Sequence, residues 1–168
     1  MHFPMAATST NKRVLAIRFD REPIAGHVNP LTFLEDGKLE LLTPAGSVVS
    51  VPLVDLKALC FVRELPTEEI WIPNRYFTVR PKTEGLWLRF RFRDRDGMDG
   101  VIPNNLLGVE PGGFTVMPPD PSFLTQRIFI PRQALTEAQI LGVIGSPLNG
   151  AKKKVAAGKP KVSTQIGL

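Results

Sequence analysis

Hydrophobic and polar residues alternate along much of this chain with the period of a β-strand. Residues 85–93 show the pattern most clearly, because one face is apolar and the other is basic. The apolar face carries Leu86, Leu88, Phe90 and Phe92. The basic face carries Arg89, Arg91 and Arg93. The pattern predicts a strand that buries one side, while its arginines bind carboxylates or an anionic ligand.

Shorter alternating segments precede this strand. They predict strands over 14–19, 24–28, 38–42, 47–51 and 58–63, with a single helical turn at 54–57. Gly26 lies inside the second segment, where a glycine indicates a bulge or a sharp bend. The 16 prolines and 14 glycines, with few long helical patterns, favour an all-β fold.

The same order of segments recurs in the second half. Leu15, Ile17 and Phe19 match Leu88, Phe90 and Phe92, and each set is expected to point into the core of its own half. Gly26 matches Gly100, residues 37–42 match 112–117, Pro52 matches Pro131, and Leu56 matches Leu135. The match predicts an internal duplication of a five-strand unit. Chance similarity between two alternating stretches is the alternative.

The pattern divides the chain into five parts. Residues 1–11 are predicted to be a flexible lead-in, 12–65 a first small barrel and 85–146 a second. Residues 66–84 form a connector whose apolar side chains are expected to pack between the barrels; these are Trp71, Ile72, Tyr76, Phe77 and Val79. Residues 147–168 are predicted to be a disordered tail.

The net charge of +5 comes from this tail. It holds five lysines and no acid, so the rest of the chain carries 16 basic and 16 acidic side chains. The high pI therefore gives no evidence of a basic face on the folded body. We expect any contact with bulk nucleic acid to come from the tail lysines Lys152, Lys153, Lys154, Lys159 and Lys161.

Five short strands, a bent second strand and a one-turn element before the fifth resemble the Sm-like small barrel. The resemblance covers about residues 12–65 and 85–145 and implies a tandem pair; both halves are also similar to uncharacterised bacterial domains that occur in pairs. Sm-like proteins bind RNA through an Arg-Gly-Asp type loop between strands four and five. Here that loop reads Pro52-Leu-Val-Asp55 or Pro131-Arg-Gln-Ala134, without the motif.

A second resemblance concerns the basic strand. PilZ-type cyclic-dinucleotide receptors use Arg-x-x-x-Arg followed by Asp/Asn-x-Ser-x-x-Gly. Arg91-Phe-Arg-Asp-Arg95 fits the first pattern, and Asn104-Asn-Leu-Leu-Gly108 partly resembles the second. The resemblance implies that Arg91 and Arg95 hold phosphate or guanine.

Catalytic chemistry has few candidate residues. The only histidines are His2 and His27, and Cys60 lies in an apolar run that predicts a buried thiol. Asp94, Asp96 and Asp99 are expected to be solvated turn charges. The same shortage of ligands argues against a bound metal, and no glycine-rich phosphate loop or other cofactor motif is present. The sequence therefore predicts no enzyme and no cofactor.

Two functions remain open. We expect a non-enzymatic adaptor that holds a protein partner through a barrel surface or a sheet edge. The alternative is nucleotide or nucleic-acid binding through Arg89, Arg91, Arg93 and Arg95, assisted by the tail. The start of the chain lacks the pattern of a secretion signal and no apolar run reaches membrane-spanning length, so a soluble cytoplasmic protein is expected. The partner and the oligomeric state are left open.

Overall fold

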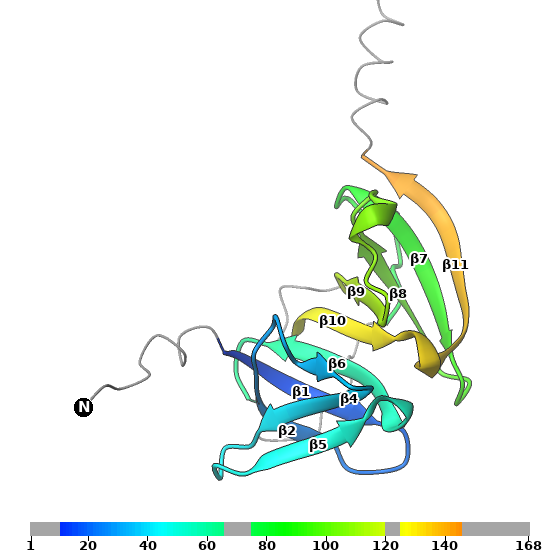
Figure 1. The fold of residues 1–168 in the computed structure, drawn as a ribbon. Coiled ribbons are helices and arrows are strands. Elements are labelled where there is room, and N and C mark those ends of the chain that lie inside the picture. The colour runs from blue at the N-terminus through cyan, green and yellow to red at the C-terminus, as the bar shows by residue number, and fades with distance from the viewer. Residues whose placement is uncertain (1–10, 66–74, 120–124, 146–168) are drawn as a thin grey trace, which may run out of the picture.

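The computed structural model describes residues 11–65, 75–119 and 125–145, and these residues are mostly β-strand (Figure 1). The tail lysines and the connector residues Trp71 and Ile72 lie outside the described residues. The strands are β1 (Lys12–Arg18), β2 (Ile24–Val28), β3 (Leu34–Glu35), β4 (Lys38–Leu42), β5 (Val48–Pro52), β6 (Leu56–Val62), β7 (Gly85–Phe92), β8 (Gly97–Ile102), β9 (Gly113–Val116), β10 (Thr125–Pro131) and β11 (Leu135–Ile144). Three short 3-10 helices are η1 (Leu53–Asp55), η2 (Leu106–Gly108) and η3 (Arg132–Ala134). Within the described ranges, no helix has the length and apolar character needed to cross a membrane.

The two halves pair their strands in the same order. In the first half β6 pairs with β1, β1 with β2, β2 with β4 and β4 with β5, all antiparallel. In the second half β11 pairs with β7, β7 with β8 and β9 with β10. A single bridge between Val101 and Met117 connects β8 to β9, as the single pair His27 and Leu42 connects β2 to β4.

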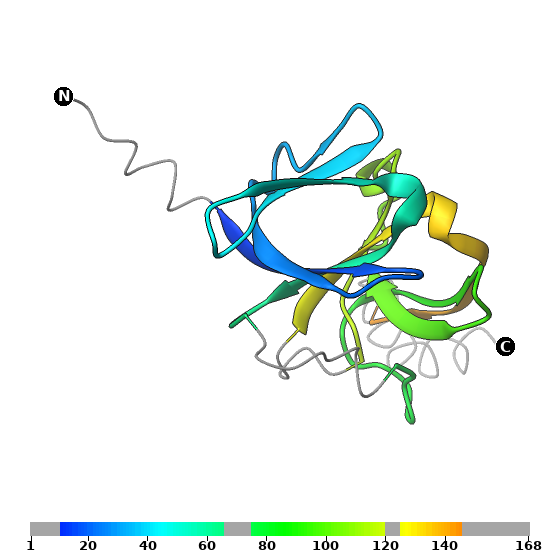
Figure 2. The same cartoon turned by 90° about the horizontal axis from the view of Figure 1, so that it is seen from below.

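Gly26 and Gly100 lie at these two narrow connections. A Cβ atom on Gly26 would lie 2.5 Å from the carbonyl oxygen of Leu42. On Gly100 it would lie 2.8 Å from Cβ of Val116. Both distances are too short for a side chain, so the next strand crosses close to the backbone at the same place in each half. The bend expected from Gly26 is confirmed. Figure 2 shows how strongly the strands of the first half curve.

The short helices η1 and η3 also occupy matching places. Each follows a proline with similar backbone angles, φ −59° and ψ 138° at Pro52 and φ −61° and ψ 138° at Pro131. The backbone N–H of Leu53 donates to Gly37, and that of Arg132 donates to Gly112. A proline fits here because its φ suits the first turn and its missing N–H is not needed. The helical turn expected at 54–57 thus begins one residue earlier, and Lys57 belongs to β6.

The expected pair of closed barrels is wrong for the described residues, which form open sheets. β6 of the first half pairs with β10 of the second, so strands of both halves join one eight-stranded sheet. β11, β7 and β8 form a separate three-stranded sheet. The two halves are therefore joined by backbone pairing between β6 and β10. The connector side chains were expected to pack between the halves, but Val79 is 70% exposed and Tyr76 is 45% exposed.

One hydrophobic core is shared by both halves. It contains Leu15 and Ile17 of β1 together with Leu88, Phe90 and Phe92 of β7. The other core is built mainly from the first half and includes Val14 and Ala16 of β1, with Phe129 of β10. The expectation that Leu15 and Ile17 face the core of their own half is wrong, because β1 and β6 are buried on both faces. Phe19 packs against the shared core and is only partly buried.

Candidate functional site

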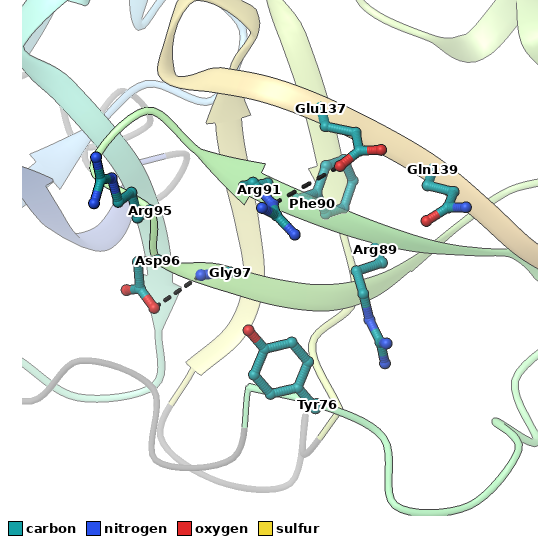
Figure 3. A pocket seen from close by; sticks show the side chains of 9 residues that line it. All are labelled: Tyr76, Arg89, Phe90, Arg91, Arg95, Asp96, Gly97, Glu137 and Gln139. Carbon is teal, nitrogen blue, oxygen red and sulfur yellow. Dashed lines mark hydrogen bonds and ion pairs between the residues drawn. The ribbon is translucent and has the colours of Figure 1, made fainter.

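The arginine strand is β7, and its basic face opens on a small cleft of about 210 Å³ (Figure 3). The cleft lies between β7, β11 and the turn that joins β7 to β8. Its lining includes Tyr76, Arg89, Arg91, Arg95 and Glu137. The structure thus brings three of the four predicted arginines to one depression, while Arg93 lines a different one.

Arg89 is held by a buried carboxylate. Its Nε lies 2.7 Å from Oδ1 of Asp99 and its Nη2 lies 3.0 Å from Oδ2. Asp99 is completely buried and also accepts hydrogen bonds from Trp87 Nε1 and from the backbone N–H of Phe77. The hydrogen bond to Asp99 raises the pKa of Arg89. Asp99 is therefore not the solvated turn charge that the sequence suggested, and it attaches the residues before β7 to the sheet.

Arg93 and Arg91 have weaker partners. Arg93 donates to the carbonyl oxygen of Val54, and its guanidinium carbon lies 3.9 Å from the centre of the Phe19 ring. Arg91 Nε lies 3.8 Å from Oε2 of Glu137 on β11, and both side chains are exposed. An exposed pair at this distance adds little stability. The carboxylates that the sequence pattern predicts beside these arginines are therefore supplied by Asp99 for Arg89 and by Glu137 for Arg91.

Arg95 stands in the turn between β7 and β8 with a φ of 73°, a left-handed conformation that a non-glycine residue seldom adopts. Its side chain is exposed, and no carboxylate within the described ranges lies at ion-pair distance from it. Figure 3 shows Arg91 directed toward Glu137 and Arg95 at the opposite side of the cleft. Among the predicted arginines, Arg95 therefore has no carboxylate partner within the described residues, and Arg91 has only the exposed contact with Glu137.

Lys57 is a buried cation that sequence reasoning missed. Its side chain leaves β6 and donates to Asp94 Oδ2 and Asp96 Oδ2, each at 2.8 Å, so it connects the first half to the turn after β7. Burial would raise the pKa of Asp96, but hydrogen bonds from Lys57 and Gly97 and the nearby positive charges lower it overall. The sequence around Lys57 does not indicate that this lysine is buried, because its partners Asp94 and Asp96 are distant in sequence. Asp94 and Asp96 thus serve a structural contact.

A second, wider basic cleft was also missed. It measures about 490 Å³ and lies where the ends of β1, β2, β6 and β10 meet. Its basic lining residues are Lys12, Arg13, His27 and Arg63, and none of the described residues that line it is acidic. Arg13 pairs directly with His27 across the strands, and its Nη1 donates to the carbonyl oxygen of Arg63 at 2.7 Å. The four residues are far apart in the sequence, so their proximity becomes apparent only from the order of the strands in the sheet.

The outer edge of β11 is the third candidate surface. Among described residues β11 pairs only with β7, and most of its ten residues are exposed. Ile140 is 59% exposed, and Glu137 is the only charged residue of the strand. In Figure 1 the strand forms the outer border of the second half. Free edges of this kind usually carry lysine, proline or covering loops that prevent strand addition, and β11 has neither lysine nor proline.

Two other residues noted in the sequence have structural positions. Cys60 is buried in β6, as expected, and burial raises its pKa to about 12. His27 is partly buried and belongs to the wide basic cleft. The five lysines proposed to contact nucleic acid lie outside the described residues, so that contact stays a prediction.

No curated protein and no solved structure matches this chain. One family model does match, and it covers residues 10–142, which contain every described strand except the last residues of β11. The match spans both halves and the junction between β6 and β10. The chain therefore belongs to DUF6982, a family of unknown function.

Proposed function

We propose that this protein is a non-enzymatic binding module that holds a protein partner by adding an extended segment to the edge of β11. The observation that carries the proposal is the long edge of this strand, which contains a single charged residue, Glu137, and has no strand partner within the described structure. An added strand would form main-chain hydrogen bonds with β11, and pockets beside the edge would select its side chains.

The second argument is the contrast with the rest of the sheet. β6 is the counterpart of β11 and has strands on both sides. Apolar side chains that stay exposed on a strand of a folded sheet indicate a surface that binds another molecule. Ile140 and Val143 are such side chains. Arg80 donates to the carbonyl oxygen of Val143 at 2.8 Å, which leaves the part of the edge before this residue for a partner.

A peptide-display experiment tests the proposal. A library of random seven-residue peptides is selected on the immobilised protein, and we expect enriched sequences rich in β-branched residues. The Ile140→Lys variant should lose these peptides by at least about tenfold, because a charge then lies on the proposed contact. Leu107→Lys is the matched control, since Leu107 is exposed on η2, away from this edge.

Backbone methylation identifies the binding mode. Methylating the amide nitrogen at alternate positions of a selected peptide removes its ladder hydrogen bonds and should abolish binding, whereas methylation at the intervening positions should be tolerated. Equal binding of all methylated peptides would exclude strand addition. Selection of peptides that bind Ile140→Lys as well as they bind the unmodified protein would place the site elsewhere.

For the architecture, we infer a tandem duplication of an Sm-like unit whose sheets stay open. The matching strand orders, the two close glycine crossings and the two proline-initiated 3-10 turns support this inference. The same proposal assigns a cytoplasmic protein of bacteria, following the similarity to paired bacterial domains.

Anion binding is the second candidate function. The wide basic cleft favours it, because Lys12, Arg13 and Arg63 line it and no described residue of its lining carries a carboxylate. The cleft between Arg91 and Arg95, with its PilZ-like spacing, is the other possible location. Nucleotide-sized ligands suit pockets of a few hundred Å³, so both clefts are large enough for a phosphate and part of a base or sugar.

A thermal-shift screen with nucleoside phosphates and cyclic dinucleotides tests this second function. We expect a phosphate-bearing ligand to raise the melting temperature by a few degrees if either cleft binds it. If the ligand binds in the wide cleft, the double variant Arg13→Ala with Arg63→Ala should remove the shift in melting temperature. If it binds in the cleft between Arg91 and Arg95, the double variant Arg91→Ala with Arg95→Ala should remove the shift. Absence of any shift at millimolar ligand would reject the anion-binding function.

A further inference from the structure

The wide basic cleft lies at the border of the shared core, where strands of both halves meet. Val62 of β6 belongs to that core and also lines the cleft. Arg13 lies two residues before Leu15 on β1, so it is on the same face of the strand, at the border of the core. Gln126 lines the cleft from β10. The cleft therefore combines residues of both halves at the contact between β6 and β10.

Arg13 and His27 are direct partners across β1 and β2. The Cβ atoms of opposed residues lie about 4.5–5.5 Å apart, so the two side chains leave the sheet close together and on the same face. Nη1 of Arg13 donates to the carbonyl oxygen of Arg63 at 2.7 Å, which holds one end of the guanidinium. This is its one hydrogen bond within the described residues, so its other N–H groups are available to a ligand.

Three permanent cations line the cleft with exposed side chains, namely Lys12, Arg13 and Arg63. Within the described parts of the chain, none of them has a carboxylate at ion-pair distance. Glu64 follows Arg63 in the sequence but is not among the lining residues. Like charges around one depression repel one another, and a bound anion relieves this repulsion. The charge of the cleft therefore favours an anionic ligand.

β10 has a bulge at the cleft. Thr125 pairs with Val62 and Arg127 pairs with Phe61, so Gln126 is an extra residue between two successive pairs. A bulge of this kind changes the direction of a side chain and is common beside binding sites. Gln126 is exposed and lines the cleft, where its amide N–H groups can donate to an anion. This irregularity is a second, independent indication of a ligand.

The number and placement of the cations indicate the kind of anion. One phosphate group carries about −1.5 to −2 charges at neutral pH, less than the three permanent positive charges of the lining. Lys12 and Arg13 are consecutive on β1 and leave it on opposite faces, which suits two phosphate groups better than one. The volume of about 490 Å³ is within the usual range of ligand pockets.

We propose that the wide basic cleft binds a diphosphate group, either as inorganic pyrophosphate or as part of a nucleotide. Arg13 and His27 bind one phosphate where β1 and β2 pair, and Lys12 and Arg63 bind the other. Gln126 donates a further hydrogen bond from β10. The inference rests on the second proposed function, anion binding, and names its site and its ligand class.

Titration calorimetry of the full-length protein at about 0.15 M salt tests the ligand class. We expect inorganic pyrophosphate to bind at least about tenfold more tightly than inorganic phosphate, because it forms more charge-assisted hydrogen bonds. AMP should bind as weakly as phosphate. ADP should bind more tightly than pyrophosphate if the natural ligand is a nucleotide, and no more tightly if it is inorganic. Equal affinities for phosphate and pyrophosphate would overturn the diphosphate assignment.

Two matched double variants test the location. Arg13→Ala with Arg63→Ala should weaken pyrophosphate binding by at least about thirtyfold, because two charged donors are lost. Arg21→Ala with Lys82→Ala removes the same charge from exposed residues outside the cleft and should change the affinity by less than about twofold. Gln126→Ala keeps the charge and should weaken binding by about three- to tenfold. Equal losses in the two double variants would show attraction by net charge alone and would overturn the site.

Proton NMR at constant pH locates the ligand independently. The chain has two histidines, His2 and His27, so few imidazole C–H signals need to be assigned, and His27→Gln identifies those of His27. These signals should shift when pyrophosphate is added to the unmodified protein. They should not shift at the same ligand concentration in Arg13→Ala with Arg63→Ala. Binding by calorimetry without a shift of the His27 signals would place the ligand elsewhere and overturn the inference.

The outcomes separate the inference from the anion-binding function. Loss of pyrophosphate binding in Arg91→Ala with Arg95→Ala, but not in Arg13→Ala with Arg63→Ala, overturns the inference and leaves that function standing. An oligonucleotide that binds the wide cleft more tightly than pyrophosphate or ADP would assign it to nucleic acid and also overturn the inference. If no phosphate ligand binds either cleft, both fail together. Far-ultraviolet circular dichroism of each variant confirms that it is folded.

Discussion

β6 and β11 hold the same position in the two halves, yet their surroundings differ. Each follows a proline and a 3-10 turn, and each pairs with the first strand of its half. β6 is buried along its whole length, because β10 covers its second edge and cores lie on both of its faces. Within the described ranges β11 has β7 as its one strand neighbour, and it is exposed over most of its length. The two strands have the same topological position, so the difference in burial comes from the strand that pairs with the second edge of β6. The comparison teaches that this neighbour, more than the topology of the repeated unit, determines whether the strand is buried.

The largest expected difference concerns thiol reactivity at matching positions. Burial raises the pKa of Cys60 to about 12. At pH 8 a thiol with that pKa has a thiolate fraction about a thousandfold below that of an ordinary cysteine. Gln139→Cys should therefore react with a maleimide at least about a thousandfold faster than Cys60, at protein concentrations where the chain is monomeric. Mass spectrometry of the labelled protein gives both rates.

The unmodified protein is the control for this measurement, because Cys60 is its only cysteine. Labelling should become fast only after unfolding in urea. Rapid labelling of native Cys60 would show that the contact between β6 and β10 opens readily, and the contrast between the two strands would then be lost.

Truncating a side chain in each strand gives the next largest effect. Leu59 of β6 is completely buried in the core of the first half, so Leu59→Ala should lower the free energy of unfolding by about 2–5 kcal/mol. Ile140→Ala removes an exposed side chain and should change it by less than about 0.5 kcal/mol in the monomer. Urea unfolding followed by the fluorescence of Trp71 and Trp87 measures both. Similar losses for the two variants would contradict the assigned burial.

A third test extends the comparison to the two sides of β7. Asp99 on β8 is buried against Arg89, whereas Glu137 on β11 is exposed beside Arg91. Asp99→Ala leaves Arg89, Trp87 and a backbone N–H without their acceptor and should cost about 2–3 kcal/mol. Glu137→Ala should cost less than about 1 kcal/mol, and added salt should reduce the effect. Chemical unfolding at low and high salt separates these results.

The smallest expected effect concerns Lys57, the bulge residue of β6. Because the pKa of Asp96 is lowered in the folded protein, its ionised form stabilises the folded state at pH values above the ordinary pKa of a carboxylate. This contribution is lost as the pH falls below about 4, through the folded pKa. Lys57→Met should therefore destabilise the protein by on the order of 1 kcal/mol at pH 7 and much less at pH 3.

Urea unfolding at both pH values measures this difference. Thr136→Met at the matching position of β11 is the control, and its effect should not depend on pH. A constant deficit of Lys57→Met from pH 7 to pH 3 would mean that the lysine acts through packing rather than through Asp96.

Much of the secondary structure could be predicted from the sequence. The alternation around Phe90, the bend at Gly26 and the turn after Pro52 are local signals, and local chemistry determines each of them. The order of strands followed from the repeated pattern. The burial of Cys60 followed from the apolar run around it.

The errors arose where the two halves meet. Every residue from Val14 to Ile17 is apolar, so alternation could not say which face belongs to which core. Leu15 and Ile17 were assigned to the wrong core for this reason. The open sheets have the same origin, since no local feature of β6 indicates that β10 will pair with it.

The candidate sites divide in the same way. A row of arginines is visible in sequence, but the partners of Arg89 and Arg91 come from neighbouring strands that the pattern does not align. Lys57 with Asp96 and the basic cleft around Arg13 depend on contacts between distant segments. The free edge of β11 could not be predicted from the sequence, because it depends on the lack of a second neighbouring strand among the described residues.

The shared core has a consequence for the order in which the chain is made. The first half leaves the ribosome with Leu15, Ile17 and Cys60 on a face that, in the described structure, is covered by residues of the second half, most of them on β7, β8 and β10. Until those strands are synthesised, that apolar face and the open edge of β6 stay in water, where they favour aggregation. We therefore expect the two halves to fold as one cooperative unit, after the second half has been translated.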